Sequence, residues 1–197
     1  MEKIKKELTQ IEFEKILIEF QDIYGNEKTI YDIGKDVVDI VKKIIPAKEV
    51  HFLLITDSEK VLETITLSNN IKIDIASSLS MMLQCYESKE AFFSNDIERD
   101  IYYKSEIDNF LDYPLKNLLL SPLLTENNQC LGIIWAAIPK KDLNQYMQSD
   151  LTYIRQISIL DENILAREKK EQKRDREVRD NESTSSVVKR LKSWLFK

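Results

Sequence analysis

The chain has 197 residues, of which 43% are hydrophobic and 32% are charged, which suits one domain with extensions rather than two full domains. Charges of both signs give a net charge of only -5, so no large field of one sign marks nucleic acid as a partner. No continuous apolar run has the length of a signal peptide or a membrane span. We therefore expect a cytoplasmic protein that does not bind nucleic acid.

The first two predicted elements are helices. Residues 4–24 carry more apolar surface than one contact face needs, so one side is expected to face the domain and another a partner chain. We therefore predict that residues 1–24 form a dimerisation helix. The second helix is predicted to begin at Thr29, to carry apolar residues at helical spacing, and to end before Pro46.

The middle of the chain is predicted to alternate between strands and helices. Residues 49–56 are rich in β-branched and aromatic residues, and residues 60–67 alternate in polarity, so the two segments are expected to form a hairpin. Residues 73–87 are predicted to be helical, and residues 91–93 to form a short strand. Residues 94–113 form a long polar connection, and connections of this length are often functional.

Two further strands and a closing helix complete the predicted domain. Residues 118–124 and 130–138 flank turn residues and are expected to pair. Ser149 is the expected cap of a helix that carries apolar residues as far as Leu165.

Two segments follow the closing helix. Residues 167–186 are predicted to be a charged and flexible linker, and residues 187–197 to be an amphipathic, basic helix. The tail resembles the membrane-targeting helix at the C-terminus of the actin-like bacterial cell-division protein. Docking of this helix on a partner protein or on the domain itself is the alternative. The residues assigned to membrane binding are Val187, Val188, Lys189, Arg190, Leu191, Lys192, Trp194, Leu195 and Phe196.

Four segments together resemble the GAF domain family over residues 25–166. They are residues 89–109, 118–124, 130–137 and 150–166, taken in their order and spacing. The resemblance implies an α+β fold with an antiparallel sheet of five or six strands. It implies a helical layer on one face, and loops or short helices over a pocket on the other. It also implies dimers, commonly through the first and last helices.

A pocket under this resemblance would be lined from the inner face of the sheet and its covering helices. The alternative is that several of its residues are plain core. We expect no cofactor and no metal, because the two cysteines are far apart and neither forms a metal-binding pattern with the single histidine, His51. The predicted lining residues are Met81, Met82, Cys85, Phe110, Ser121 and Trp135.

Two functions of GAF proteins fit the residues poorly. The set typical of cyclic-nucleotide binding is broken here, because Asn144 is followed by Tyr146, Asp150 and Leu151 where the family has Phe, Asp and Glu. Free methionine-(R)-sulfoxide reductases need clustered cysteines, and only two are present.

We therefore predict a non-enzymatic GAF signalling or scaffold protein. It is expected to form a homodimer, to bind other signalling proteins, and to be held at the cytoplasmic face of the membrane by its tail on an anionic surface. A small-ligand sensor, with cyclic nucleotides among the ligands considered, and the sulfoxide reductase are the alternatives.

Overall fold

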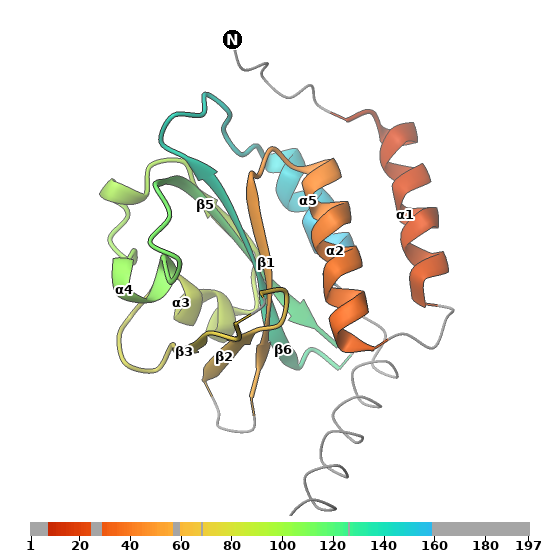
Figure 1. The fold of residues 1–197 in the computed structure, drawn as a ribbon. Helices are drawn as coiled ribbons and strands as arrows, with labels where there is room; N and C mark the ends of the chain where they lie inside the picture. Colours follow the sequence, from red (N-terminus) through yellow and green to blue (C-terminus); the bar gives the residue numbers. More distant parts are fainter. Residues whose placement is uncertain (1–7, 25–28, 57–59, 68, 126, 159–197) are drawn as a thin grey trace, which may run out of the picture. The chain divides into compact units, whose positions relative to one another are not determined.

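The computed structural model describes residues 8–24, 29–56, 60–67, 69–125 and 127–158. The predictions for the linker 167–186 and the tail 187–197 lie outside these residues. The strands form one antiparallel sheet in the order β3-β2-β1-β6-β5-β4 (Figure 1). Their bounds are β1 Glu49–Ile55, β2 Val61–Thr64, β3 Lys72–Asp74, β4 Phe92–Ser94, β5 Leu115–Leu124 and β6 Cys130–Pro139.

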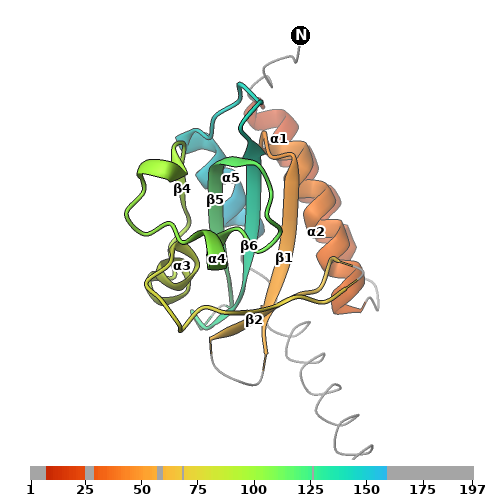
Figure 2. The same cartoon turned by 60° about the vertical axis from the view of Figure 1, so that its left-hand side comes forward.

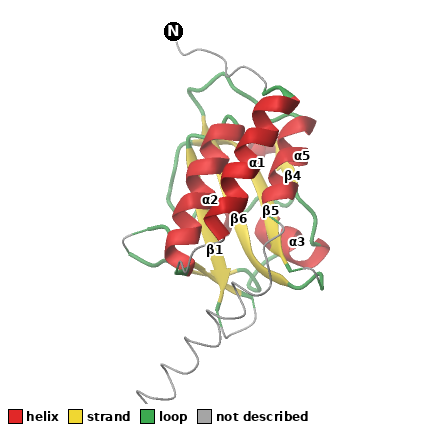
Figure 3. Ribbon diagram, turned by 90° about the vertical axis from the view of Figure 1, so that its right-hand side faces the viewer, coloured by secondary structure: helices red, strands yellow, loops and turns green. Residues whose placement is uncertain are grey.

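Helices cover both faces of the sheet (Figures 1 and 2). On one face α2 and α5 lie against the strands, and α1 lies outside them (Figure 3). On the other face α3 and the short α4 pack with the connections around them. The bounds are α1 Gln10–Tyr24, α2 Ile30–Ile44, α3 Met81–Ser88, a 3-10 turn Ile97–Arg99, α4 Ser105–Asp108 and α5 Gln148–Ile157. The predicted α+β class and layer arrangement are confirmed.

The two central strands are apolar on both faces, because helices cover both. Trp135, Ile133 and Ala137 of β6 face α3, and the alternate residues face α2 and α5. The predicted hairpins are both present, because β1 pairs with β2 and β5 pairs with β6. The N-terminus of α2 is also as predicted, since the Thr29 hydroxyl accepts the Asp32 amide at 3.2 Å.

The helix predicted over residues 73–87 is wrong in its first half. Ile73 lies in β3 opposite Leu62, and α3 begins only at Met81 after the N-cap Ser80. Ile71, Ile73 and Ile75 alternate as in a strand, but Ile75, Leu79 and Met82 also recur at helical spacing, so the sequence pattern fits both structures. Leu79, which lies in the connection before α3 and not in a helix as predicted, is 69% exposed.

Two other helix starts differ from the prediction. The first helix begins at Gln10, where the carboxylate of Glu12 accepts the amide of Thr9 at 2.8 Å. The last helix begins at Gln148, and Ser149 does not cap it. The N-cap residue is Met147, and the carboxylate of Asp150, the third residue of the helix, accepts the Met147 amide at 2.7 Å.

Candidate functional site

Three aromatic rings meet on the face of the sheet that α3 and α4 cover. His51 of β1 and Trp135 of β6 are directly opposite each other in the sheet, so their side chains share this face. The Phe110 ring, from the connection after α4, lies 5.2 Å from the Trp135 ring and 5.9 Å from the His51 ring, while His51 and Trp135 are 5.7 Å apart. We call His51, Phe110 and Trp135 the aromatic cluster.

A buried carboxylate next to the aromatic cluster belongs to a residue that hydrogen-bonds to α3, to the start of α4 and to β6. Asp108, at the end of α4, accepts the amides of Met81 at 3.1 Å, Met82 at 2.8 Å and Lys104 at 2.7 Å. Its backbone carbonyl accepts the Trp135 Nε1–H at 2.7 Å. Burial raises the pKa of Asp108 to about 6, against the backbone amides, which favour the carboxylate. Asp108 therefore caps α3 and fastens α4 to β6.

His51 carries the one polar side-chain atom of the aromatic cluster that has no hydrogen-bond partner among the described residues. Its Nδ1 lies 3.4 Å from the Thr66 hydroxyl. Its Nε2 is buried and has no hydrogen-bond partner among the described residues, with a Glu49 carboxylate oxygen 3.7 Å away. Burial and then the nearby Lys42 lower the pKa of His51 from 6.5 to about 4, so the ring is neutral at physiological pH. A neutral ring nitrogen without a partner can form a hydrogen bond to a ligand group that reaches it.

The structure brings together five of the six residues predicted to line a pocket. Met81, Met82 and Cys85 of α3 are buried in the same core cluster as Trp135, and the half-buried Phe110 packs against that cluster. Ser121 does not join them. It points to the opposite face of the sheet, where its hydroxyl bonds to that of Ser158 at 2.7 Å. The pairing of β5 with β6 shifts in register between Leu115 and Asn117, and this irregularity sets the face on which each later residue of β5 lies. The sequence has no signal for it, so the face of Ser121 was not predictable.

Sequence reasoning missed the two polar residues of this face. Asp108 lies within the predicted polar connection 94–113 without a predicted role of its own, and His51 is considered only as a metal ligand, for which the sequence has no pattern. Strand alternation from the apolar Leu53 places His51 on the same face. No local pattern points to Asp108, because its partners Met81 and Met82 are 27 and 26 residues away.

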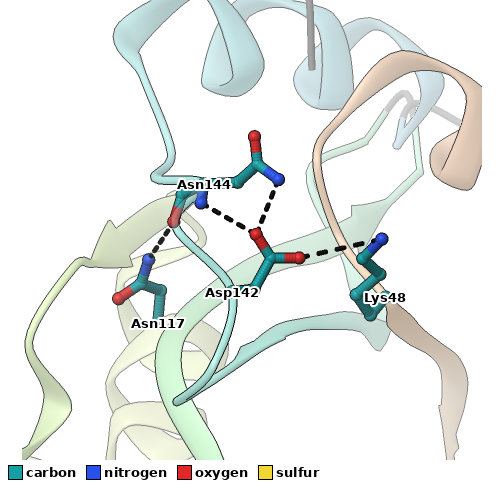
Figure 4. A network of polar contacts seen from close by, with 4 residues as sticks. All are labelled: Lys48, Asn117, Asp142 and Asn144. Carbon is teal, nitrogen blue, oxygen red and sulfur yellow. Dashed lines mark hydrogen bonds and ion pairs between the residues drawn. The ribbon is translucent and has the colours of Figure 1, made fainter. Parts of the chain in front are cut away.

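A second polar network fastens the connection between β6 and α5 (Figure 4). Asp142 accepts the backbone amide of Asn144 at 2.8 Å and its side-chain amide at 2.6 Å. Asn117 of β5 donates to the Asn144 carbonyl at 2.9 Å, and Lys48 lies 3.7 Å from Asp142. The connection that leads into α5 is thus held at the ends of β1 and β5.

The residues at the cyclic-nucleotide positions serve this same connection and α5. Asn144 belongs to the network of Figure 4, and Tyr146 is buried with its backbone bonded on both sides to Asn95. The Asp150 carboxylate accepts the amide of Met147, the N-cap residue of α5, and Leu151 is buried. These contacts hold the β6–α5 connection and the start of α5 in place.

Neither cysteine is placed as a nucleophile. Cys85 is fully buried, and burial, with Cys130 nearby, raises its pKa well above the ordinary value. The Cys130 thiol is buried and lies 3.3 Å from the Gly132 carbonyl. Within residues 8–158, apart from the gaps stated above, no three His, Cys, Asp or Glu side chains are grouped as a metal site. No helix in the same described part has the length and hydropathy needed to cross a membrane.

The sequence matches no family model, and no curated protein is similar to it in sequence. Solved structures share the fold. The GAF domain of A. aeolicus nlh2 in an inactive state is 10% identical, with a TM-score of 0.55 over 76% of this chain and 92% of that one. The GAF domain of a phosphoenolpyruvate-protein phosphotransferase from Coxiella burnetii is 14% identical, with a TM-score of 0.59 over 76% and 89%.

An enzyme has the same fold. The free methionine-R-sulfoxide reductase of Neisseria meningitidis, solved in complex with its substrate, is 13% identical, with a TM-score of 0.58 over 80% of this chain and 92% of that one. These similarities establish a GAF-like fold. At such identities they do not carry an activity from one chain to another.

Proposed function

We propose that the chain is a non-enzymatic signalling module that senses a small ligand on the α3 and α4 face of its sheet. The observation that carries this proposal is the buried Nε2 of His51, which has no hydrogen-bond partner among the described residues. A buried polar atom left without a partner costs about 1 to 3 kcal/mol, and a bound ligand would remove that cost. This observation favours the sensor over a scaffold that binds nothing.

The chemistry of this face indicates what kind of ligand would bind. His51 is neutral at physiological pH, so it offers a hydrogen bond and no charge. Phe110 and Trp135 offer aromatic surface next to it. We therefore propose a flat, uncharged or weakly charged ligand with a polar group that reaches His51.

The non-enzymatic part of the proposal rests on the cysteines. Sulfoxide reduction by a GAF protein needs a reactive thiolate, and burial disfavours the thiolate of Cys85. Cys130 is also buried. These thiols are packing groups in our proposal, which supports a sensory role over the reductase alternative.

A thermal melt tests the sensor. We expect one compound in a panel of nucleobases, cyclic nucleotides and aromatic metabolites to raise the Tm. A ligand at one hundred times its Kd stabilises by about 2.7 kcal/mol, which corresponds to roughly 5 to 10 °C for a chain of this size. His51→Phe keeps a ring but removes Nε2, so the shift should be lost.

Tyr146→Phe is the matched control. It removes another buried polar atom without a partner in the described residues, away from the aromatic cluster, and should keep the full shift. If no compound shifts the wild type, or if His51→Phe responds as the wild type does, the sensor proposal must be abandoned for the scaffold.

We further propose that residues 187–197 bind the protein to an anionic membrane surface. Four basic residues and no acidic residue occur in these eleven positions. When the segment is helical, one face is shared by Val187, Val188, Leu191, Trp194 and Leu195. Each basic residue near an anionic leaflet adds about 1 kcal/mol. An isolated helix of this length is marginal in water, so a single tail should bind weakly and reversibly.

Flotation with vesicles tests the membrane proposal. Full-length protein is expected to float with vesicles rich in phosphatidylserine, and less with phosphatidylcholine alone. Trp194→Glu puts a charge on the apolar face and should abolish flotation. Ser193→Glu puts the same charge on the polar face and should only weaken it. Equal loss in both variants, or flotation that survives deletion of residues 187–197, would remove the tail as the anchor.

A further inference from the structure

The carboxylate of Glu49 lies next to the unpartnered nitrogen of His51. The two residues are two positions apart on β1, so their side chains share the face of the sheet that α3 and α4 cover. Oε2 of Glu49 is 3.7 Å from Nε2 of His51, which is too far for a hydrogen bond. The Glu49 side chain is 39% exposed, whereas that of His51 is only 7% exposed. The carboxylate can therefore be reached from solvent and also adjoins the buried ring.

The contacts of His51 indicate which ring nitrogen carries its hydrogen. The Thr66 oxygen accepts the Phe52 amide at 3.3 Å, so the hydroxyl hydrogen of Thr66 is available for Nδ1 of His51, 3.4 Å away. At Nε2, the nearby carboxylate of Glu49 favours an N–H over a bare nitrogen. Both neighbours thus favour the same neutral tautomer, in which Nδ1 accepts and Nε2 can donate.

A donor beside an acceptor fits the opposite pair on a ligand. The Nε2–H of His51 needs an acceptor, and an ionised carboxylate such as that of Glu49 only accepts. Flat heterocycles carry the matching edge in two forms, as a ring nitrogen next to an amino group or as a ring carbonyl next to a ring N–H. We call this arrangement the acceptor–donor edge. Phe110 and Trp135 add aromatic surface beside the same histidine.

We propose that Glu49 and His51 together recognise the acceptor–donor edge of a flat, uncharged heterocycle. This inference rests on the ligand site proposed above, and it adds Glu49 as the residue that selects the ligand. The ligand acceptor takes the Nε2–H of His51, and the ligand N–H donates to the Glu49 carboxylate. A hydrogen bond to a charged group is stronger than one between neutral groups, so Glu49 contributes most of the selectivity. A ligand carboxylate or phosphate at this position would meet a like charge and be rejected.

Calorimetry with matched compounds tests the selection. Adenine, aminoquinazoline and quinazolinone carry the acceptor–donor edge. Their comparison compounds have a methyl group in place of the amino group, or on the ring nitrogen of quinazolinone, and cannot donate. We expect at least one compound with the edge to bind, and its methyl analogue to bind about tenfold more weakly or worse.

The outcomes separate this inference from the ligand site itself. If a methyl analogue binds as well as its partner and binding is still lost in His51→Phe, the site stands and recognition of the edge is wrong. If compounds without the edge bind at His51 while none with the edge does, the inference also falls. If nothing binds at all, the ligand site and the inference fall together.

Substitution of Glu49 tests the assigned residue. Glu49→Leu removes the acceptor, so the compound with the edge should lose about tenfold in affinity while its methyl analogue should not. Glu49→Gln keeps a neutral acceptor and should lose less. Glu63→Leu is the control, because Glu63 follows the core residue Leu62 on β2 and therefore lies on the opposite face of the sheet. A preference that survives Glu49→Leu, or that Glu63→Leu removes equally, would overturn the proposal.

The tautomer can be measured without any ligand, because His51 is the single histidine of the chain. Nitrogen-15 NMR of histidine-labelled protein distinguishes a ring nitrogen that carries hydrogen from one that does not. At neutral pH we expect the hydrogen on Nε2 and a bare Nδ1. A hydrogen on Nδ1 would leave no donor beside Glu49 and would overturn recognition of the edge, while the ligand site would stand.

Discussion

Replacing Gly132 with alanine is expected to lower the free energy of unfolding by about 3 kcal/mol or more. A Cβ at this position would lie 2.0 Å from the backbone carbonyl oxygen of Leu53 in β1, and 3.1 Å from a methyl group of Leu123. The carbonyl belongs to the central strand pair, so it cannot move without separating β1 from β6. Overpacking usually costs about 1 to 3 kcal/mol, and we expect the upper end or more here because the obstacle is backbone.

Gly34→Ala is the matched control. Its Cβ would meet the end of the Ile65 side chain at 2.8 Å, and a side-chain end can turn away. The change also adds about 1 kcal/mol of helix propensity in α2. Urea unfolding of both variants should show a loss of about 3 kcal/mol or more for Gly132→Ala and a change within about 1 kcal/mol for Gly34→Ala. Similar losses in both would mean that β1 and β6 are not held as closely as described.

Replacing Asp108 with alanine is expected to have the next largest effect. It leaves the amides of Met81, Met82 and Lys104 without an acceptor. Each buried amide left unsatisfied costs about 1 to 3 kcal/mol, so the sum is about 3 kcal/mol or more. Ser80→Ala removes the neighbouring N-cap bond to Leu83 and should cost only about 1 kcal/mol, which makes it the control.

The same carboxylate and His51 should give opposite pH dependences. Burial raises the pKa of Asp108 from 3.8 to about 6, so between these values the folded chain holds a proton that the unfolded chain has lost. Its contribution to stability therefore falls as pH rises from about 4 to 6. The pKa of His51 is lowered from 6.5 to about 4, so the unfolded chain takes up the proton first, and stability falls as pH decreases through that window.

Single substitutions separate the contributions of Asp108 and His51 to the pH dependence of stability. His51→Phe should gain stability relative to the wild type as pH falls from about 6.5 to 4. Asp108→Asn should lose it over the same range. Urea midpoints at half-unit pH steps give the comparison. Parallel pH curves for the two variants would show that these groups do not titrate as described.

The fold was predictable where a pattern was local. The Thr29 cap, the strand at 49–55 and the hairpin around residues 126–128 each depend on neighbouring residues, and the structure has all three. The start of α3 was not predictable in this way. The run from Ile71 to Ile75 satisfies both strand and helix spacing, and pairing of Ile73 with Leu62 of β2 decides for the strand.

The candidate site was predictable in its apolar part alone. Met81, Met82, Cys85 and Trp135 follow from helix and strand periodicity, which indicates a shared core. The role of Asp108 depends on its hydrogen bonds to a helix more than twenty residues away in the sequence. The Nε2 of His51 lacks a partner because no described residue brings a donor or acceptor within hydrogen-bond distance of it. Tertiary contacts of this kind have no local pattern in a single sequence.

Small-ligand sensing without turnover can be followed through the fluorescence of Trp135. The chain has two tryptophans, so Trp194→Phe leaves Trp135 as the single reporter, with its ring 5.7 Å from that of His51. Titration with the compound that raises the Tm should change the emission of Trp135 in a saturable way, and His51→Phe should lose this response. Chromatography should recover the compound unchanged. A Tm shift with no change at Trp135, or conversion of the compound, including reduction of free methionine sulfoxide supplied with dithiothreitol, would contradict the account.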